Sequence, residues 1–271
     1  TSLHMPDSVT TIGEYAFSGT GIEHLRIDKN ITTIGRAAFA CLNKCRSILF
    51  APPSALEIIP ESCFSESLVF DQQDAFILHI PASVKSIGDG AFWGCNSIGK
   101  LLLEHGLQSI GKVAFKDCAG LRQLWIPETV REIKVSAFSD CNIKILNLLN
   151  AVSSSLVGIG DRAFYKNCIE TLNLPDSILH MGIECFRHNK LASVRLPYNL
   201  RTVSRYCFAD NRIGVCNGGF GPNLVRFEHY AFANNSLPSL QIPASLEYIG
   251  KYSFAHNLIK TLTFTGIQDS T

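Results

Sequence analysis

Ten cysteines and eight histidines are the residues of this 271-residue chain that could bind a metal, form disulfides or act as nucleophiles. A structural zinc site would need closely spaced pairs such as Cys-x-x-Cys, and the sequence contains neither such a pair nor a cysteine and histidine at zinc spacing. The motifs His-Glu-x-x-His and Gly-x-Ser-x-Gly are absent too, and the glycine-rich stretch 217–221 lacks the lysine of a phosphate-binding loop. We therefore predict no metal, no cofactor and no enzymatic activity.

The cysteines instead occupy fixed places in a repeated segment. Residues 87–95 read IGDGAFWGC and residues 249–257 read IGKYSFAHN, and the same frame recurs every 22 to 28 residues. Its anchor phenylalanines are Phe17, Phe39, Phe64, Phe92, Phe115, Phe138, Phe164, Phe186, Phe208, Phe232 and Phe254. Repetition at this period is typical of solenoids, so the sequence predicts one domain over 1–271 with insertions near 65–76 and 149–156.

Each position of the frame has a structural role. Apolar residues stand eight and five places before the anchor, and seven copies follow the second of them with a glycine, which indicates a turn or a close backbone approach. The residue directly before the anchor is always Ala, Cys or Ser, because a larger side chain would collide with the next coil about 5 Å away. Upstream, apolar residues alternate with outward ones, as at Leu78 and Ile80, which predicts one short strand per repeat and a long parallel sheet.

Three residues after most anchors stands Cys or Asn, with Cys168 one place later than the rest. Such an interior polar side chain can bond backbone groups that each coil leaves unpaired as it turns, and stacked copies would form a ladder. Four cysteines lie on this ladder, three replace the small residue before the anchor, and one lies in a predicted strand. We therefore expect buried free thiols, with a Cys41–Cys45 bridge or a bridge between ladder neighbours as the alternative.

The consensus L-x-x-L-x-I-P-x-S-L-x-x-I-G-x-x-A-F-x-x-C/N resembles the BspA-like, or treponemal-type, class of leucine-rich repeats, and residues 237–257 match it almost letter for letter. The resemblance implies a right-handed, β-rich leucine-rich-repeat solenoid of the α/β repeat class. A parallel concave sheet would form one side, and short turns, 3₁₀ segments or short strands the other. It also implies a secreted, periplasmic or cell-surface protein that binds other macromolecules, as in adhesion to a host. Copies depart from the consensus at 40–76, 149–156 and 213–222, where we expect the sheet to bulge or break.

The composition narrows the class of partner. Lys+Arg 24 and Asp+Glu 23 leave a net charge of +1, so no overall field attracts the chain to nucleic acid. No stretch approaches the roughly 18 to 20 consecutive apolar residues of a membrane helix, and the start shows no signal-peptide pattern. Because the chain opens in the middle of the repeat pattern without a methionine, we expect a piece of a longer protein.

Side chains that project from the predicted sheet are free to bind another protein. Most are polar, but the middle repeats carry Leu102, Trp125 and Ile145, joined by Leu149 where other copies have proline. Large apolar groups on a polar face mark interaction sites, and tryptophan is strongly enriched at binding hot spots. We predict a binding surface here. Its polar rim consists of His79, Lys100, Gln123 and Asn147.

Alternatives to this surface remain open. The insertion at 149–156 would, if folded over the apolar residues, turn them into a satellite core. A structural role is a second alternative, because the chain begins and ends on bare strands whose open edges could pair between copies and give a homo-oligomer. A third reading makes the chain the ligand-binding part of a larger receptor.

Overall fold

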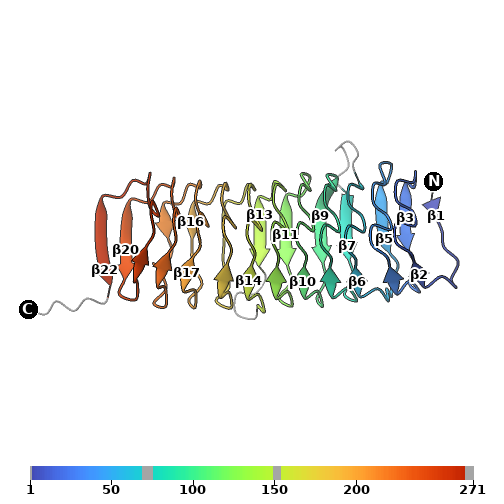
Figure 1. Ribbon diagram of the computed structural model, residues 1–271, viewed down its shortest axis with the longest axis horizontal. Coiled ribbons are helices and arrows are strands. Elements are labelled where there is room, and N and C mark those ends of the chain that lie inside the picture. Colours follow the sequence, from blue (N-terminus) through green and yellow to red (C-terminus); the bar gives the residue numbers. More distant parts are fainter. Residues whose placement is uncertain (1, 69–75, 149–153, 266–271) are drawn as a thin grey trace, which may run out of the picture.

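The computed structural model describes residues 2–68, 76–148 and 154–265, which form strands and turns without a helix. The repeats lie side by side as coils of one long stack, with the N-terminus at one end and the C-terminus at the other (Figure 1). Strands of neighbouring coils pair in parallel, which confirms the predicted solenoid. Residues that repeat along the sequence therefore line up in rows along the stack.

The first strand row carries the outward side chains that the sequence predicts as free. Its strands are β1 (Ser2–Leu3), β3 (His24–Ile27), β5 (Ser47–Phe50), β7 (Phe76–Ile80), β9 (Ile98–Leu103), β11 (Gln123–Ile126), β13 (Ile145–Leu148), β16 (Ser193–Val194), β18 (Val215–Cys216), β20 (Ser239–Pro243) and β22 (Thr261–Thr265). In β11, Leu124 and Ile126 are buried while Gln123 is exposed, as the alternating pattern requires.

The first row is not the continuous sheet that the sequence predicts. It is divided into the sheets β1-β3-β5, β7-β9-β11-β13, β16-β18 and β20-β22. Single bridges, Ile145 to Thr171 and Asn173 to Arg195, continue it between β13 and β16. The breaks between β5 and β7 and between β18 and β20 fall in the departures at 40–76 and 213–222, so the expectation of interruptions there is confirmed.

The second strand row consists of two-residue strands on another side of each coil. They are β2 (Thr11–Ile12), β4 (Thr33–Ile34), β6 (Ile58–Ile59), β8 (Ser86–Ile87), β10 (Ser109–Ile110), β12 (Glu132–Ile133), β14 (Gly158–Ile159), β15 (His180–Met181), β17 (Thr202–Val203), β19 (Arg226–Phe227) and β21 (Tyr248–Ile249). The isoleucine of most of these strands is the apolar residue five places before the anchor, and it points into the core.

The anchor phenylalanines form a column through the core. Consecutive rings are stacked with centroids 5.1 to 5.8 Å apart, for example 5.2 Å between Phe115 and Phe138. The anchors of the inner coils are fully buried, whereas Phe17 and Phe254 on the end coils are only partly covered. The predicted role of the anchors is therefore confirmed.

The turns around each anchor alternate left- and right-handed residues. In every coil the residues two before and two after the phenylalanine have positive φ, as Val113 at 47° and Asp117 at 60° show around Phe115. The N–H groups of these three residues donate to carbonyls of the next coil at 2.8 to 3.0 Å. Because a 3₁₀ segment needs consecutive right-handed residues, this alternation explains why the described ranges have turns and short strands, two of the three expected alternatives, and not 3₁₀ segments.

The glycine before this turn allows close backbone approach between coils. A Cβ on Gly111 would lie 2.5 Å from the backbone of Gly88, and one on Gly182 would lie 2.3 Å from the Asp161 backbone nitrogen. Neither glycine has a positive φ, so the prediction of close approach, rather than of unusual dihedrals, is the correct one of the two.

The predicted ladder joins each coil to the one before it. The Cys118 Sγ lies 3.2 Å from the carbonyl oxygen of Phe92, the anchor of the preceding coil. In the later coils an asparagine bonds the preceding coil through both its amide nitrogen and its amide oxygen. Asn189 Nδ2 donates to the Phe164 carbonyl at 2.9 Å, and its Oδ1 accepts from the Ile169 N–H at 3.1 Å.

One ladder assignment from the sequence is wrong. Asn167, not Cys168, is the ladder residue of its coil, since its Nδ2 donates to the Phe138 carbonyl at 2.8 Å and its Oδ1 accepts from the Ile143 N–H. The Cys168 side chain is half-exposed instead. The side chain that enters the coil is the one three residues after the anchor, whether it is a cysteine or an asparagine.

Candidate functional site

Four neighbouring strands, β7, β9, β11 and β13, bring the predicted site residues together on one sheet. Residues at equivalent register positions form two lines across it. The first line holds His79, Leu102, Trp125 and Asn147. The second line holds Ile77, Lys100, Gln123 and Ile145. All the predicted residues in the described ranges therefore share one surface, and Leu149 lies outside these ranges.

An apolar patch spans the four strands of this sheet, with one residue on each. It consists of Ile77, Leu102, Trp125 and Ile145. The first, second and fourth of these are 52%, 37% and 45% exposed, while Trp125 is half-buried between its neighbours. Water therefore reaches several branched aliphatic side chains on adjacent strands, which is uncommon for a surface with no partner. Residues 149–153 lie outside the described ranges, so their covering of the patch stays a prediction.

A further exposed apolar side chain lies one coil away on β5, beyond the break in the first strand row. Leu49 in β5 is 50% exposed and pairs in register with Arg26 of β3. The alternation of buried Ile48 and Phe50 around it was the available signal, because it places the intervening side chain outward. This coil departs from the consensus, so the repeat pattern alone does not identify its strand.

The rim of the patch is polar and carries both signs of charge. His79 Nε2 lies 2.5 Å from the Glu104 Oε1 atom, and the other carboxylate oxygen accepts from the Ala82 N–H at 3.0 Å. Lys100 is exposed, and among the described residues no carboxylate pairs with it. The Glu104 carboxylate is thus held in place by His79 and the Ala82 N–H.

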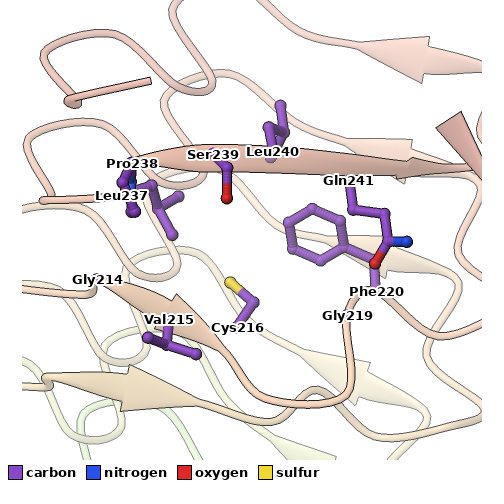
Figure 2. A pocket seen from close by; sticks show the side chains of 10 residues that line it. All are labelled: Gly214, Val215, Cys216, Gly219, Phe220, Leu237, Pro238, Ser239, Leu240 and Gln241. Atoms are coloured by element: carbon purple, nitrogen blue, oxygen red, sulfur yellow. The ribbon is translucent and has the colours of Figure 1, made fainter. Parts of the chain in front are cut away.

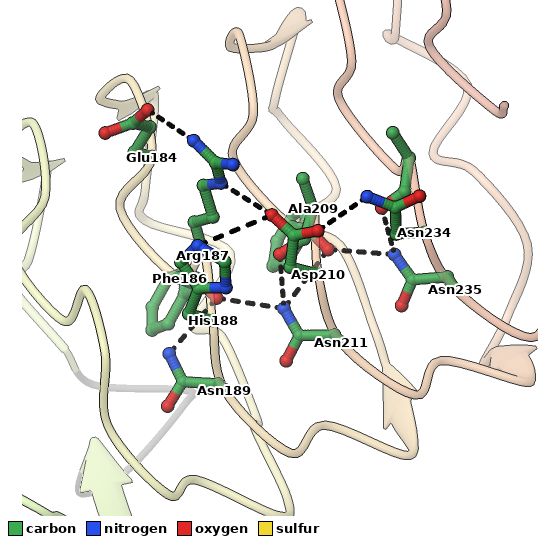
Figure 3. A network of polar contacts seen from close by, with 12 residues as sticks. Glu184, Phe186, Arg187, His188, Asn189, Ala209, Asp210, Asn211, Asn234 and Asn235 are labelled. Atoms are coloured by element: carbon green, nitrogen blue, oxygen red, sulfur yellow. Dashed lines mark hydrogen bonds and ion pairs between the residues drawn. The ribbon is translucent and has the colours of Figure 1, made fainter. Parts of the chain in front are cut away.

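A second polar cluster lies on the turn side of the later coils, and its charges are already paired (Figure 3). Arg187 bonds the carboxylates of Glu184 at 2.9 Å and Asp210 at 2.7 Å, in its own coil and the next, and its guanidinium lies over the Tyr206 ring at 4.5 Å. Burial raises the pKa of Glu184, but hydrogen bonds and charge from Arg162 and Arg187 outweigh it and hold that pKa below its usual value. This cluster ties coils together and leaves little charge for a ligand.

The cysteines have the properties of packing groups rather than of reactive thiols. All ten are free, and most are fully buried. Burial raises the pKa of Cys45 to about 11 and that of Cys216 to about 12, so both stay protonated at neutral pH and are poor nucleophiles. Within the described ranges no cluster of His, Cys, Asp or Glu could hold a metal ion. The same ranges contain no helix with the length and apolarity needed to cross a membrane.

Comparison with known proteins adds the family and the fold. The family model of the BspA type leucine rich repeat region matches residues 1–73, 69–156 and 157–270. A solved leucine-rich repeat protein from Bacteroides ovatus is 19% identical, over 92% of this chain and 80% of that chain, with a TM-score of 0.54. The pneumococcal vaccine antigen PcpA is 21% identical, over 94% of this chain and 67% of that chain, with a TM-score of 0.63. A search of curated proteins found no significant match.

Proposed function

The chain belongs to the BspA-type leucine-rich repeat family, and on this premise we propose that it is a non-enzymatic scaffold that binds another protein through the apolar patch and its rim. The observation that carries the proposal is the exposure of Ile77, Leu102 and Ile145 around Trp125 on one four-stranded sheet. Protein interfaces combine an apolar centre containing aromatic residues with a polar rim, and this surface has both.

The partner that fits this surface is a folded protein with an apolar protrusion. The patch lies on the outward side of a four-stranded sheet and spans all four strands. A carboxylate on the rim of the partner would pair with Lys100. Because the rim already holds Glu104 against His79, an acidic group placed next to that carboxylate would be repelled, which fixes the orientation of the partner.

We also propose that the protein acts outside the cell or at its surface, in adhesion or contact with a host. The family resemblance supports this placement, and a protein of the same fold is a pneumococcal vaccine antigen. Fractionation of the source cells with an antibody against the chain tests it. Recovery in the cytosol alone would contradict the placement without affecting the patch.

The two tryptophans of the chain allow a matched test of the patch. Trp125→Ala removes the central aromatic of the patch, whereas Trp93→Ala removes a 41% exposed side chain on the turn side, whose Nε1 donates to Asp117 at 3.0 Å. For a protein captured by the wild type from its natural environment, we expect Trp125→Ala to weaken binding by roughly 30-fold or more, as for a hot spot of about 2 kcal/mol, and Trp93→Ala to leave it unchanged. Equal affinity of a folded Trp125→Ala variant would refute the site.

A second copy of the chain is the other partner that a specific observation favours. In the last described coil Ile249, Leu262 and Phe264 are 51%, 53% and 56% exposed, although the equivalent residues of inner coils are buried. Pairing at this edge would cover them. Light scattering over a range of concentrations should then show dimers that Leu262→Lys abolishes. A mass that does not change with concentration would remove this candidate.

A further inference from the structure

The first strand row opens between β18 and β20, and a proline explains the opening. The coil pairs on either side of this break each have a backbone hydrogen bond just before the strand. Gly214 N donates to the Ala192 carbonyl at 2.9 Å, and Lys260 N donates to the Pro238 carbonyl at 2.9 Å. The equivalent donor toward Gly214 would be the nitrogen of Pro238, which carries no hydrogen. The sheet therefore ends at β18 and begins again at β20.

The gap is wider than a single strand spacing. No Cα atom of β18 lies within 8 Å of a Cα atom of β20, whereas paired strands are about 4.8 Å apart. At the other break, between β5 and β7, Cα atoms still approach within 8 Å. After Cys216 the chain turns away through Gly218 and Gly219, both with positive φ, and the Gly219 N–H donates back to the Cys216 carbonyl at 3.0 Å.

A cleft of about 230 Å³ lies in this gap (Figure 2). Phe220 forms its base and is fixed against Phe227 with ring centroids 4.7 Å apart. Val215 and Cys216 line one side, and Ser239 and Gln241 line the other. None of the lining residues is charged, and the volume is below the roughly 300 to 1,000 Å³ of small-molecule sites. The lining therefore favours an uncharged ligand of small cross-section.

The two walls of the cleft are strand edges with unused backbone groups. Alternate residues of a strand direct their N–H and C=O to opposite sides, and the carbonyls of Ile27 and Ile80, which are equivalent to Ile242, accept from N–H groups of the next coil at 2.8 and 3.2 Å. Ser239 and Gln241 therefore direct theirs toward β18. Among the described residues no hydrogen bond joins these groups to β18. The Gly214 carbonyl and the Cys216 N–H on the facing edge have no backbone partner there either.

From this geometry we propose that the cleft between β18 and β20 is a strand-addition site for an extended, uncharged peptide segment of another protein. Such a segment pairs its backbone with Ser239 and Gln241 along β20 and places an apolar side chain on Phe220. Backbone pairing at an open edge is an established mode of peptide recognition, and it supplies the hydrogen bonds that both walls lack. The site does not depend on the apolar patch, which lies on other strands.

Backbone hydrogen exchange of the full chain tests the site in the absence of a known partner. In the free protein the amides of Ser239 and Gln241 should exchange much faster than those of Leu240 and Ile242, which face β22. The probe is the capped peptide acetyl-Val-Thr-Val-Thr-amide, and its control is the same peptide N-methylated on every residue. At ten times its Kd the first peptide should slow exchange at Ser239 and Gln241 roughly tenfold. The control should have no effect.

Three results would overturn the site. The amides of Ser239 and Gln241 could be as protected as that of Leu240 in the free chain, which would mean that the edge is already paired. Equal protection by both peptides would mean that backbone pairing is not involved. Protection that rises with protein concentration alone would assign the cleft to a second copy. A Phe220→Ala variant whose melting is checked separately should weaken peptide protection, because the apolar base is lost.

Discussion

The middle and the C-terminal coils join to their neighbours in different ways. In the middle, the ladder residues Cys95, Cys118 and Cys141 each donate to one carbonyl of the preceding coil, and strands of four to six residues pair beside them. Toward the C-terminus, asparagines bond a carbonyl and an N–H, and β16 and β18 have only two residues. Side-chain bonds thus accompany the short strands β16 and β18, although β20 and β22, with five residues each, also pair beside an asparagine. The four-stranded sheet with the apolar patch lies in the region of the cysteine ladder.

Truncation of the anchors tests whether the two regions share one core, and it should have the largest effect. Phe115→Ala in the middle and Phe208→Ala toward the C-terminus should each lower the free energy of unfolding by about 3 to 5 kcal/mol, because coils on both sides prevent the site from collapsing. Urea unfolding followed by circular dichroism measures this. Phe254→Ala should cost clearly less, since that ring is already partly exposed. A Phe115→Ala variant that unfolds at the wild-type urea concentration would disprove the column as a shared core.

Ladder substitutions should separate the two regions more sharply. Asn211→Ala leaves the Leu191 N–H without its acceptor and the Phe186 carbonyl with Asn189 Nδ2 as its remaining side-chain donor, and it should cost about 2 kcal/mol. Cys118→Ala removes one weak thiol bond and should cost about 1 kcal/mol or less. The exposed Asn173 offers a control, and Asn173→Ala should leave unfolding unchanged. Equal losses for Asn211→Ala and Cys118→Ala would show that the second asparagine bond adds nothing.

Acid should weaken the C-terminal coils before the middle ones, with a smaller effect than either substitution. Burial raises the pKa of Asp210, but the hydrogen bonds and charge of Arg187 outweigh this effect and lower that pKa. The pKa of Glu184 is lowered in the same way. A lowered pKa means stability that is present at neutral pH and is lost as the pH falls through the folded-state value, so the loss begins below about pH 4. Hydrogen exchange at pH 3.5 and 6 would detect it. Loss of protection first around Phe115 would contradict this assignment.

Sequence reasoning located the features that every coil must share. The sequence predicted the buried anchors, the small residues before them and the glycines of close approach. These features could be predicted because neighbouring coils lie at a fixed distance in every repeat. The left-handed turns could not be predicted from residue type, because Val113 and Tyr206 occupy positions where glycine would be expected. Their conformation follows instead from hydrogen bonds to the next coil.

The candidate site could likewise be predicted from the sequence only in part. The outward positions of β9, β11 and β13 followed from alternation, so Leu102, Trp125 and Ile145 could be placed on one surface from sequence. Leu49 was missed because its repeat departs from the consensus. The departure at 213–222 predicted a break, but the sequence pattern did not connect it to Pro238 of the following coil, which has no hydrogen to donate toward Gly214.

Fluorescence of a single tryptophan tests the central claim, that the apolar patch contacts the partner, most directly. In a Trp93→Phe variant all tryptophan emission comes from Trp125. Addition of a protein partner that lacks tryptophan should shift this emission to shorter wavelength, because the half-buried ring loses its remaining water. The emission of Trp93 in a Trp125→Phe variant should not move. A complex that leaves the Trp125 emission unchanged, or that shifts only the Trp93 emission, would place the binding surface elsewhere on the solenoid.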